Sequence, residues 1–230
     1  MEFIQKRCIF PILQYDNVGK PKRFLGTGFF INSEGLFLTA KHVFKDNPLL
    51  EDECYKIALD VTPLEVYKIG DIVMSRNYDI AKGVAINISN VSFPRFPDKN
   101  IPLNQDVLTL EYSDTLYHTL PSGSTVIKFM SSTRKGNVIK VYHSDYPESI
   151  KTLCLELSFP VFRGASGAPV IVNLSWELAG MLVENIERQL MPAHVIKVKN
   201  GDKYEEEHQY FMPVGKAIHW SHLKDFAEHE

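Results

Sequence analysis

The segment GTGFFINSEGLFLTAKHVF, from Gly26 to Phe44, carries the clearest fold signal in the chain. Apolar runs lie on either side of a Ser-Glu-Gly turn, so the segment predicts two strands joined by that turn. The second run leads into Thr-Ala-Lys-His and places His42 directly after a strand. Short apolar or alternating runs separated by turn residues continue along most of the chain, which is the pattern of an all-β protein.

The predicted strands form two sets, separated by a connector over 87–105 that is rich in Pro and Asn. They are Ile9–Gln14, Phe24–Ile31, Gly35–Thr39, Tyr55–Val61, Glu65–Met74, Gly83–Ile88, Val107–Glu111, Ser124–Met130, Lys135–Tyr142, Thr152–Leu157, Ala168–Val172, Leu178–Val183, His194–Lys199 and Tyr204–Met212. The last two flank Asn200-Gly201, a strong hairpin signal. Apolar residues at helical spacing then predict a short amphipathic helix over 214–229. So many strands with little helix indicate a sandwich or barrels.

Composition and charge narrow the class of protein. The 230 residues are 44% hydrophobic and 23% charged, as in soluble globular proteins, and the net charge is −3. This charge does not favour nucleic acid or an anionic membrane as a partner. Three scattered cysteines give neither a disulfide framework nor a metal-binding spacing, and His219 and His222 lack a third ligand and are expected at the surface. We therefore expect no metal or cofactor, and a reduced, cytoplasmic protein without a signal peptide.

Two further segments carry candidate catalytic residues. Asp79 opens a strand in RNYDIAKGVAI, and Ser166 lies in FRGASGAPVIV. With His42 they give the order His, Asp, Ser. A serine hydroxyl becomes an effective nucleophile when a neighbouring imidazole accepts its proton, and a buried carboxylate fixes the tautomer of that imidazole. The three residue types together predict nucleophilic catalysis.

Asp79 is preferred to three other aspartates. Asp46 lies in a turn too near His42, and Asp60 and Asp71 lie inside predicted strands. Asp79 opens a strand and remains the first candidate.

The glycines around Ser166 have a chemical reason of their own. An oxyanion hole needs backbone N–H groups that converge on one point, and Gly164 and Ser166 are the candidate donors. Glycine at the first position permits unusual backbone geometry and lets a substrate carbonyl approach.

These residues together resemble a known family. The sequence is similar to the trypsin/chymotrypsin-fold serine endopeptidases, specifically the disulfide-free bacterial branch of HtrA/Deg protease domains, from about Phe24 to His222. The likeness rests on T-A-x-H ending at His42, Y-D-I-A around Asp79, G-A-S-G-A-P around Ser166 and the strand ELAGMLVEN that follows. The order His, Asp, Ser is also the order of this family.

The resemblance implies two six-stranded antiparallel β-barrels with the site in the cleft between them and a short C-terminal helix. The N-terminal barrel is expected over 1–90, the connector over 91–105, the C-terminal barrel over 106–213, and the helix and tail over 214–230. No PDZ-like module is expected.

The resemblance also implies the roles of the residues. His42 is the general base, Asp79 its orienting carboxylate and Ser166 the nucleophile of a serine endopeptidase that cleaves protein substrates through an acyl-enzyme. Gly164 and Ser166 supply the oxyanion-hole amides. The implied substrate-binding residues are Pro160, Val161, Leu182, Val183, Glu184 and Asn185. Proline at position 160 favours a small or apolar P1 side chain, whereas the glutamate at 184 would favour a basic one.

Three departures from the family pattern leave alternatives open. Ala165 replaces the aspartate that captures a new N-terminal amine in zymogen-activated trypsins, so activation by N-terminal cleavage is not expected. Lys82 follows Asp79-Ile80-Ala81 where an apolar residue is usual, and Val183 replaces a serine that supports the triad carboxylate in many relatives. The alternative is a catalytically weak or inactive binding or adaptor module. A third possibility is a protease that is latent until an activating protein partner binds.

Overall fold

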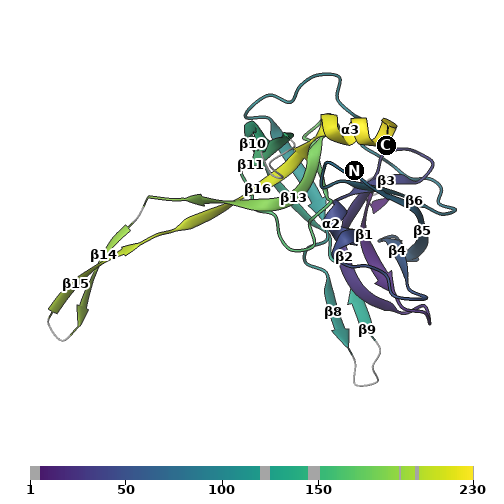
Figure 1. Cartoon of the computed structure of the whole chain (residues 1–230), viewed down its shortest axis with the longest axis horizontal. Coiled ribbons are helices and arrows are strands. Elements are labelled where there is room, and N and C mark those ends of the chain that lie inside the picture. Colours follow the sequence, from purple (N-terminus) through teal and green to yellow (C-terminus); the bar gives the residue numbers. More distant parts are fainter. Residues whose placement is uncertain (1–5, 120–124, 145–150, 192, 200–201, 230) are drawn as a thin grey trace.

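The structure, a computed structural model, describes residues 6–119, 125–144, 151–191, 193–199 and 202–229. Two closed six-stranded antiparallel barrels make up its body (Figure 1), which confirms the fold that the sequence predicts. In the described ranges no helix has the length and apolar character that a membrane span requires.

The first barrel pairs its strands in the order β1-β2-β3-β6-β5-β4. Its elements are β1 (Ile9–Tyr15), β2 (Pro21–Phe30), β3 (Leu36–Thr39), α2 (Lys41–Lys45), β4 (Cys54–Leu59), β5 (Glu65–Met74) and β6 (Ala81–Ala85). Its interior is aromatic: the ring centroid of Phe10 lies 4.5 Å from that of Phe30 and 5.4 Å from that of Phe37. All three side chains are fully buried. The apolar residues of the Gly26–Phe44 segment therefore fill the core that its pattern predicts.

The second barrel has the same topology. Starting from β7, its strands follow the order β7-β10-β11-β16-β13-β12, which repeats the connectivity of the first barrel. Its strands are β7 (Asp106–Glu111), β10 (Ser132–Ser144), β11 (Thr152–Leu157), β12 (Pro169–Val172), β13 (Leu178–Gln189) and β16 (Phe211–His219). Buried aliphatic residues, among them Val138, Leu157 and Val170, fill its interior.

The connector runs from one barrel to the other along the surface. The Ser92 N–H donates to the Arg7 carbonyl at 3.0 Å, and Asn104 N–H donates to Val138 in the second barrel at 2.8 Å. Between these points Arg95 forms an isolated bridge with Glu177. These main-chain bonds explain why a segment without periodicity is ordered.

Two hairpins extend from the second barrel. One consists of β8 (Leu116–Thr119) and β9 (Thr125–Lys128), and β8 is a strand that the sequence did not predict. The other, β14 (Ala193–Lys199) and β15 (Asp202–His208), continues a long ribbon formed by β13 and β16 (Figure 1). The Asn200-Gly201 turn lies outside the described residues. β13 extends to Gln189, beyond the predicted end at Val183.

The C-terminal helix is shorter than predicted. Helix α3 spans Trp220–His229, whereas the expected helical residues Val214 and Ile218 belong to strand β16. From Val214 onward β16 is buried because it pairs with β13 on one edge and with β11 on the other. A strand in that position is apolar on both faces, so its residues also match helical spacing.

His219 and His222 also differ from the surface position that the sequence predicts. His219 is 3% exposed at the end of β16, and His222 accepts a hydrogen bond from Leu153 N–H at 2.9 Å. Burial lowers the pKa of His219 to about 4. His219 is therefore a neutral residue of the packed interior near α3.

Candidate active site

The pairing of β3 with β6 brings His42 and Asp79 together. Thr39 at the end of β3 lies opposite Ala81 at the start of β6, so the residues just beyond these ends are neighbours. His42 Nδ1 and Asp79 Oδ2 are 2.6 Å apart, and the His42 backbone N–H donates to Asp79 Oδ1 at 2.9 Å. The carboxylate is thus held at both oxygens by one residue.

The environment of this pair sets its charge. Burial lowers the pKa of His42, but the hydrogen bond and the charge of Asp79, with smaller contributions from Asp46 and Glu184, leave it raised overall. Burial raises the pKa of Asp79, but the bonds and charge of His42 leave it lowered overall. Asp79 is therefore ionised at neutral pH. A neutral His42 that donates from Nδ1 has Nε2 free to accept a proton.

Ser166 lies in a turn that two glycines make possible. Gly164 and Gly167 have φ angles of +96° and +85°, in the left-handed region that disfavours other residues. A Cβ atom at Gly167 would lie 2.2 Å from the carbonyl oxygen of Thr27, and one at Gly164 would lie 2.5 Å from the Phe24 ring. Ala165 between them is 1% exposed, so its methyl group is packed in the interior. The sequence G-A-S-G therefore follows from backbone geometry and close packing.

Thr27 of β2 holds this turn from the other barrel. Its N–H donates to the Ser166 carbonyl at 3.0 Å, and its hydroxyl donates to the Gly164 carbonyl at 2.8 Å. The hydroxyl also accepts from Tyr112 N–H at 3.3 Å. Sequence reasoning missed Thr27, although a small polar residue between two glycines of a buried strand is a usable signal. Thr27 sets the position of the turn relative to His42.

A second group fixes the start of the same turn. Glu111 is fully buried and accepts from Arg134 Nε at 3.1 Å. The Arg134 guanidinium lies 3.9 Å from the centroid of the Phe162 ring, in a cation–π contact. The Phe162 carbonyl in turn accepts from Ala165 N–H at 2.9 Å. Nothing in the local sequence around Arg134 indicates this contact.

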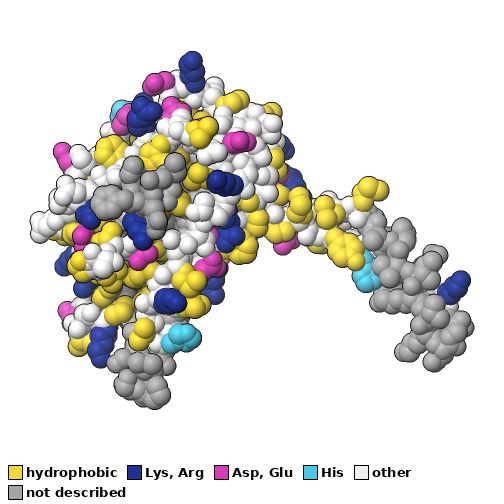
Figure 2. Space-filling model, turned by 180° about the vertical axis from the view of Figure 1, so that it is seen from behind, with side chains coloured by type: hydrophobic (Ala, Val, Ile, Leu, Met, Phe, Trp, Pro, Cys, Tyr) yellow, Lys and Arg dark blue, Asp and Glu magenta, His cyan; other side chains and the backbone are white. Residues whose placement is uncertain are grey.

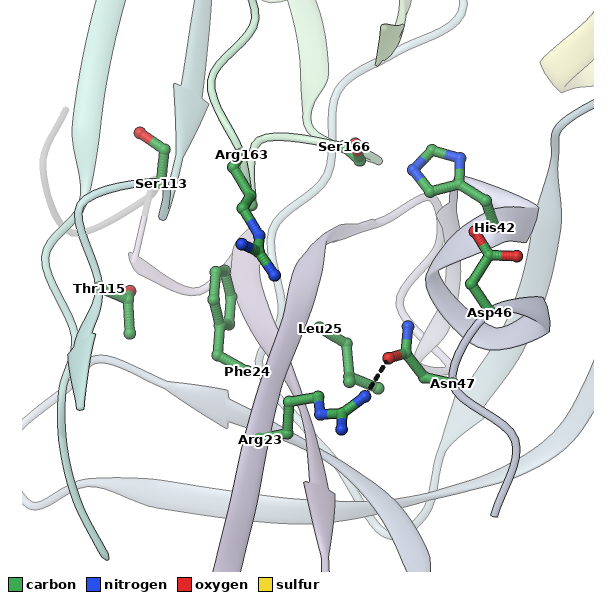
Figure 3. Close-up of a pocket in the computed structure, with 11 residues that line it drawn as sticks. Arg23, Phe24, Leu25, His42, Asp46, Asn47, Ser113, Thr115, Arg163 and Ser166 are labelled. Atoms are coloured by element: carbon green, nitrogen blue, oxygen red, sulfur yellow. Dashed lines mark hydrogen bonds between the residues drawn. The ribbon is translucent and has the colours of Figure 1, made fainter. Parts of the chain in front are cut away.

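Ser166 and His42 line the same cavity. The pocket of about 770 Å³ lies between the barrels, and Figure 3 shows the two side chains next to each other at one end of it. Its other lining residues are Arg23, Phe24, Leu25, Asp46, Asn47, Ser113, Thr115, Arg163 and Gly164. In the described part of the chain, the hydrogen bond of Ser166 Oγ runs to the Val183 carbonyl at 3.4 Å and not to His42.

The predicted substrate-binding residues lie outside this pocket. The side-chain amide of Asn185 bonds to both the N–H and the carbonyl of Val161, each at 2.6 Å. Glu184 forms an ion pair with Lys216, with Oε1 and Nζ 2.7 Å apart. Pro160, next to Val161, is partly exposed. The bonds of Asn185 tie the segment before Ser166 to strand β13.

Leu182, another of the predicted substrate-binding residues, lies in the interior of the second barrel. Its side chain is 1% exposed in the core of the second barrel. Its N–H donates to Ala168 and its carbonyl accepts from Gly167, both at 2.9 Å. The N–H and the carbonyl of Leu182 are therefore both occupied by the strand and turn that surround Ser166.

Among the described residues, no group of three or more His, Cys, Asp or Glu side chains is arranged to hold a metal ion. The chemistry available in the cleft is that of a hydroxyl, an imidazole–carboxylate pair and main-chain amides.

Comparison with known proteins identifies the family. The family model for the trypsin-like peptidase domain matches residues 26–181, and the chain belongs to this family. No curated protein sequence matches the chain.

Similar solved structures share the fold at low sequence identity. The Rv3671c protease from M. tuberculosis in its active form has a TM-score of 0.60 at 14% identity, and the match covers 96% of this chain and 79% of that one. Its inactive form gives a TM-score of 0.58 at 14% identity, with 97% and 88% covered. The MamO protease domain from Magnetospirillum magneticum gives 0.59 at 10% identity, with 98% of each chain covered.

Proposed function

We propose that this peptidase-family protein is a serine endopeptidase that cleaves protein substrates through an acyl-enzyme. In this proposal Ser166 attacks the scissile carbonyl while His42 takes its proton and then gives it to the leaving amine. Asp79 orients the imidazole and stabilises the imidazolium, and the amides of Gly164 and Ser166 bind the oxyanion. Water then hydrolyses the ester by the same route in reverse. The observation that supports this most is the two-point bond between His42 and Asp79 beside Ser166 in one cleft.

The position of the Ser166 hydroxyl suggests how attack begins. In the free protein the hydroxyl donates to the Val183 carbonyl. A substrate N–H that takes over this acceptor would release the hydroxyl, which then donates to His42 Nε2. Substrate binding and activation of the nucleophile are coupled in this scheme.

We propose a small or apolar P1 side chain. The negative charge of Glu184 is balanced by its ion pair with Lys216, so Glu184 offers little attraction to a basic side chain. Pro160 supplies no charge at the other end of the site. A cleavage profile from a peptide library with Arg or Lys at P1 would contradict this preference.

A fluorophosphonate probe tests the proposed mechanism directly. We expect the wild-type protein to be labelled at Ser166, with the adduct located by mass spectrometry, and Ser166→Ala to remain unlabelled. Ser113 lines the same pocket, so Ser113→Ala is the matched control and should be labelled as the wild type is. Absence of labelling in the wild type, alone and with host lysate, would contradict the proposal.

The free-state bond of Ser166 to Val183 also favours a second candidate function, an inactive protease-fold module that binds proteins without cutting them. A latent protease that needs an activating protein partner would share this free state. The two are separated by the same probe, since a latent enzyme becomes labelled when the partner is added and an inactive module does not.

We further propose a reducing compartment such as the cytoplasm. The three cysteines are unpaired, and burial raises the pKa of Cys154 to about 11, which makes it an unreactive thiol. Cell fractionation of the native host tests this location.

A further inference from the structure

The pocket that begins at Ser166 and His42 extends away from strand β13. The Val183 carbonyl of β13 accepts from Ser166 Oγ at 3.4 Å, yet no residue of β13 is among the described residues that line the pocket. Its lining comes from β2, from α2 and the residues after it, from the segment after β7 and from the Ser166 turn. In the proposed function a substrate N–H bonds to Val183, and the leaving amine takes its proton from His42. The residues after the scissile bond therefore enter this pocket.

Two guanidinium groups line the pocket. Arg163 precedes Gly164 in the Ser166 turn, and Arg23 belongs to β2. Figure 3 shows both side chains directed into the space between the turn and β2. Arg23 Nη1 donates to Asn47 Oδ1 at 2.8 Å, which holds this head group at the pocket wall. One cation comes from each barrel, so both can contact a chain that lies in the cleft.

In the described part of the chain, neither Arg23 nor Arg163 forms an ion pair. Arg7, Arg134 and Arg188 differ from them, because each pairs with a glutamate. On the face of the molecule that Figure 2 shows, basic and acidic side chains are interspersed. The two pocket arginines therefore carry positive charge that no neighbouring carboxylate balances, and an anionic ligand would balance it.

A buried hydroxyl adds a neutral donor to the pocket. Thr115 is 9% exposed, and its Oγ1 has no hydrogen-bond partner among the described residues. A buried hydroxyl without a partner costs free energy, and a carboxylate that accepts from it removes that cost. The hydroxyl of Ser113, also in the lining, is occupied because it donates to Glu111 Oε1 at 2.9 Å. Figure 3 places Thr115 on the side of the pocket opposite His42.

An acidic side chain gives the pocket a polarity. Asp46 lines it next to His42, and the charge of Asp46 contributes to the raised pKa of His42. Arg23 and Arg163 lie further from His42 (Figure 3). The first residue after the scissile bond begins at the leaving amine beside His42, so an acidic side chain there would meet Asp46. Each residue of an extended chain advances about 3.3 Å, so the second and third residues lie nearer to the arginines.

We propose that this pocket selects substrates with an acidic side chain at P2′ or P3′, bound by Arg23 and Arg163 with Thr115 as a further donor. The inference rests on the proposed function. A guanidinium binds a carboxylate through paired N–H donors and keeps its charge at every physiological pH. Position P1′ differs, since Asp46 disfavours an acid there. The substrate class is polypeptide with an acidic residue shortly after the cleaved bond.

Matched peptide substrates test the preference. Each has an amidated C-terminus and carries Glu, Gln or Lys at one position after the scissile bond. We expect kcat/KM to be about fivefold higher for Glu than for Gln at P2′ or P3′, because two exposed charge pairs contribute about this much. Lys should fall below Gln. Equal values for Glu and Gln at both positions overturn the proposal. A gain that appears only with a free C-terminal carboxylate also overturns it, because the pocket then binds a chain end.

Substitutions test the same preference from the protein side. The double variant Arg23→Gln/Arg163→Gln should lose the ratio of Glu to Gln, and this ratio cancels any general loss of turnover. Lys45→Gln is the matched control, since Lys45 is an exposed cation of α2 that does not line the pocket. It should keep the ratio. If the double variant keeps the ratio, or Lys45→Gln loses it, the pocket does not set the preference.

The polarity of the pocket is tested by Asp46→Asn. We expect this variant to raise the ratio of Glu to Gln at P1′ about twofold, the effect of one exposed charge, and to leave the ratio at P2′ and P3′ in place. An unchanged ratio at P1′ would contradict the exclusion of acids from that position.

Binding to Ser166→Ala separates this inference from the proposed function. Fluorescence anisotropy would measure the dissociation constants of a neutral, amidated peptide in which one Glu or Gln is moved along the sequence. If the wild type does not react with the fluorophosphonate probe, the proposed function fails. Tighter binding of a Glu peptide that Arg23→Gln/Arg163→Gln abolishes would still support an acid-binding pocket. Equal binding of Glu and Gln peptides at every position overturns the inference even if the wild type is labelled.

Discussion

The two barrels have the same strand order but supply different kinds of groups to the cleft. The first barrel supplies two side chains, His42 and Asp79, that are held by a hydrogen bond and by charge. The second supplies a turn around Ser166 whose geometry depends on two glycines and on main-chain bonds. A side-chain pair depends on a few atoms, whereas a turn depends on the packing of its whole neighbourhood.

This difference indicates where the site is sensitive to change. A substitution of Asp79 in the first barrel is expected to alter the protonation of His42 and to leave the fold in place. A substitution behind the turn of the second barrel is expected to change the position of Ser166 and the stability of the protein together. Thr27 belongs to the first barrel but bonds to the turn of the second, so it couples the two.

The largest expected effect tests whether the two barrels act as one catalytic unit. We expect Ser166→Ala and His42→Ala each to lower kcat by about 10⁶-fold, and the double variant to lower it no further. Folding should be retained, since neither side chain is in a core cluster. Steady-state hydrolysis of a peptide and thermal unfolding provide the measurements. Additive losses in the double variant would show that the residues act separately.

Asp79→Asn is expected to lower kcat by about 10⁴-fold because the amide stabilises the wrong tautomer of His42. The pH profile adds a second readout. In the wild type the pKa of His42 is raised, so activity should fall as the pH drops through a midpoint above about 6.5. In Asp79→Asn burial is the main remaining influence on the pKa of His42. Burial lowers this pKa, so the acid limb of the pH profile should move to lower pH. A limb that does not move would exclude His42 as the titrating base.

Thr27→Val tests the coupling between the barrels. The variant loses the bond to the Gly164 carbonyl and leaves Tyr112 N–H without its acceptor. We expect a loss of about 1–3 kcal/mol of unfolding free energy and a fall of about tenfold in kcat, with KM changed less.

Thr109→Val is the matched control, because the Thr109 hydroxyl is also buried and donates to Pro169 at 2.9 Å. It should lose stability in urea unfolding but keep more of its kcat than Thr27→Val. Equal kcat losses in both variants would mean that Thr27 acts through stability alone.

The smallest effect concerns Lys82, which departs from the family pattern. Its Nζ donates to the carbonyls of Phe226 and Ala227 at 3.3 Å, near the end of helix α3. A cation at a helix C-terminus is favourable, so Lys82→Met should cost about 0.5–1 kcal/mol of stability and leave kcat unchanged. Lys68→Met, at an exposed position on the adjacent strand β5, is the control and should cost less. A changed kcat in Lys82→Met would connect the helix to the site.

The success of sequence reasoning depended on how local the signal was. Strands β5 and β11 match the predicted Glu65–Met74 and Thr152–Leu157 because turn residues bound each apolar run. The outer half of β13 was missed since its ribbon has no core to impose alternation. Val214 and Ile218 were assigned to a helix because a strand buried on both faces has no period of two.

The residues of the site also differ in whether the sequence could predict them. The motifs around His42, Asp79 and Ser166 are local, and the structure brings all three strand ends to one cleft. Thr27 and Arg134 were not found, because each acts on a turn that lies far away in the sequence. The burial of Leu182 and the pairing of its peptide groups with the Ser166 turn were not predicted either, because a contiguous motif does not show which peptide groups are paired.

The sequence by itself determined an all-β chain, the glycine turn at Ser166 and the residue types from which a catalytic triad is built, since these depend on side-chain pattern and backbone geometry within a few residues. Tertiary structure alone decided the partners of those residues: the two-point bond of His42 to Asp79, the hydroxyl of Thr27 behind the turn, and the bond of Ser166 Oγ to the Val183 carbonyl. The physical reason is that hydrogen bonds between distant strands depend on register and closure of the barrels, which no short stretch of sequence contains.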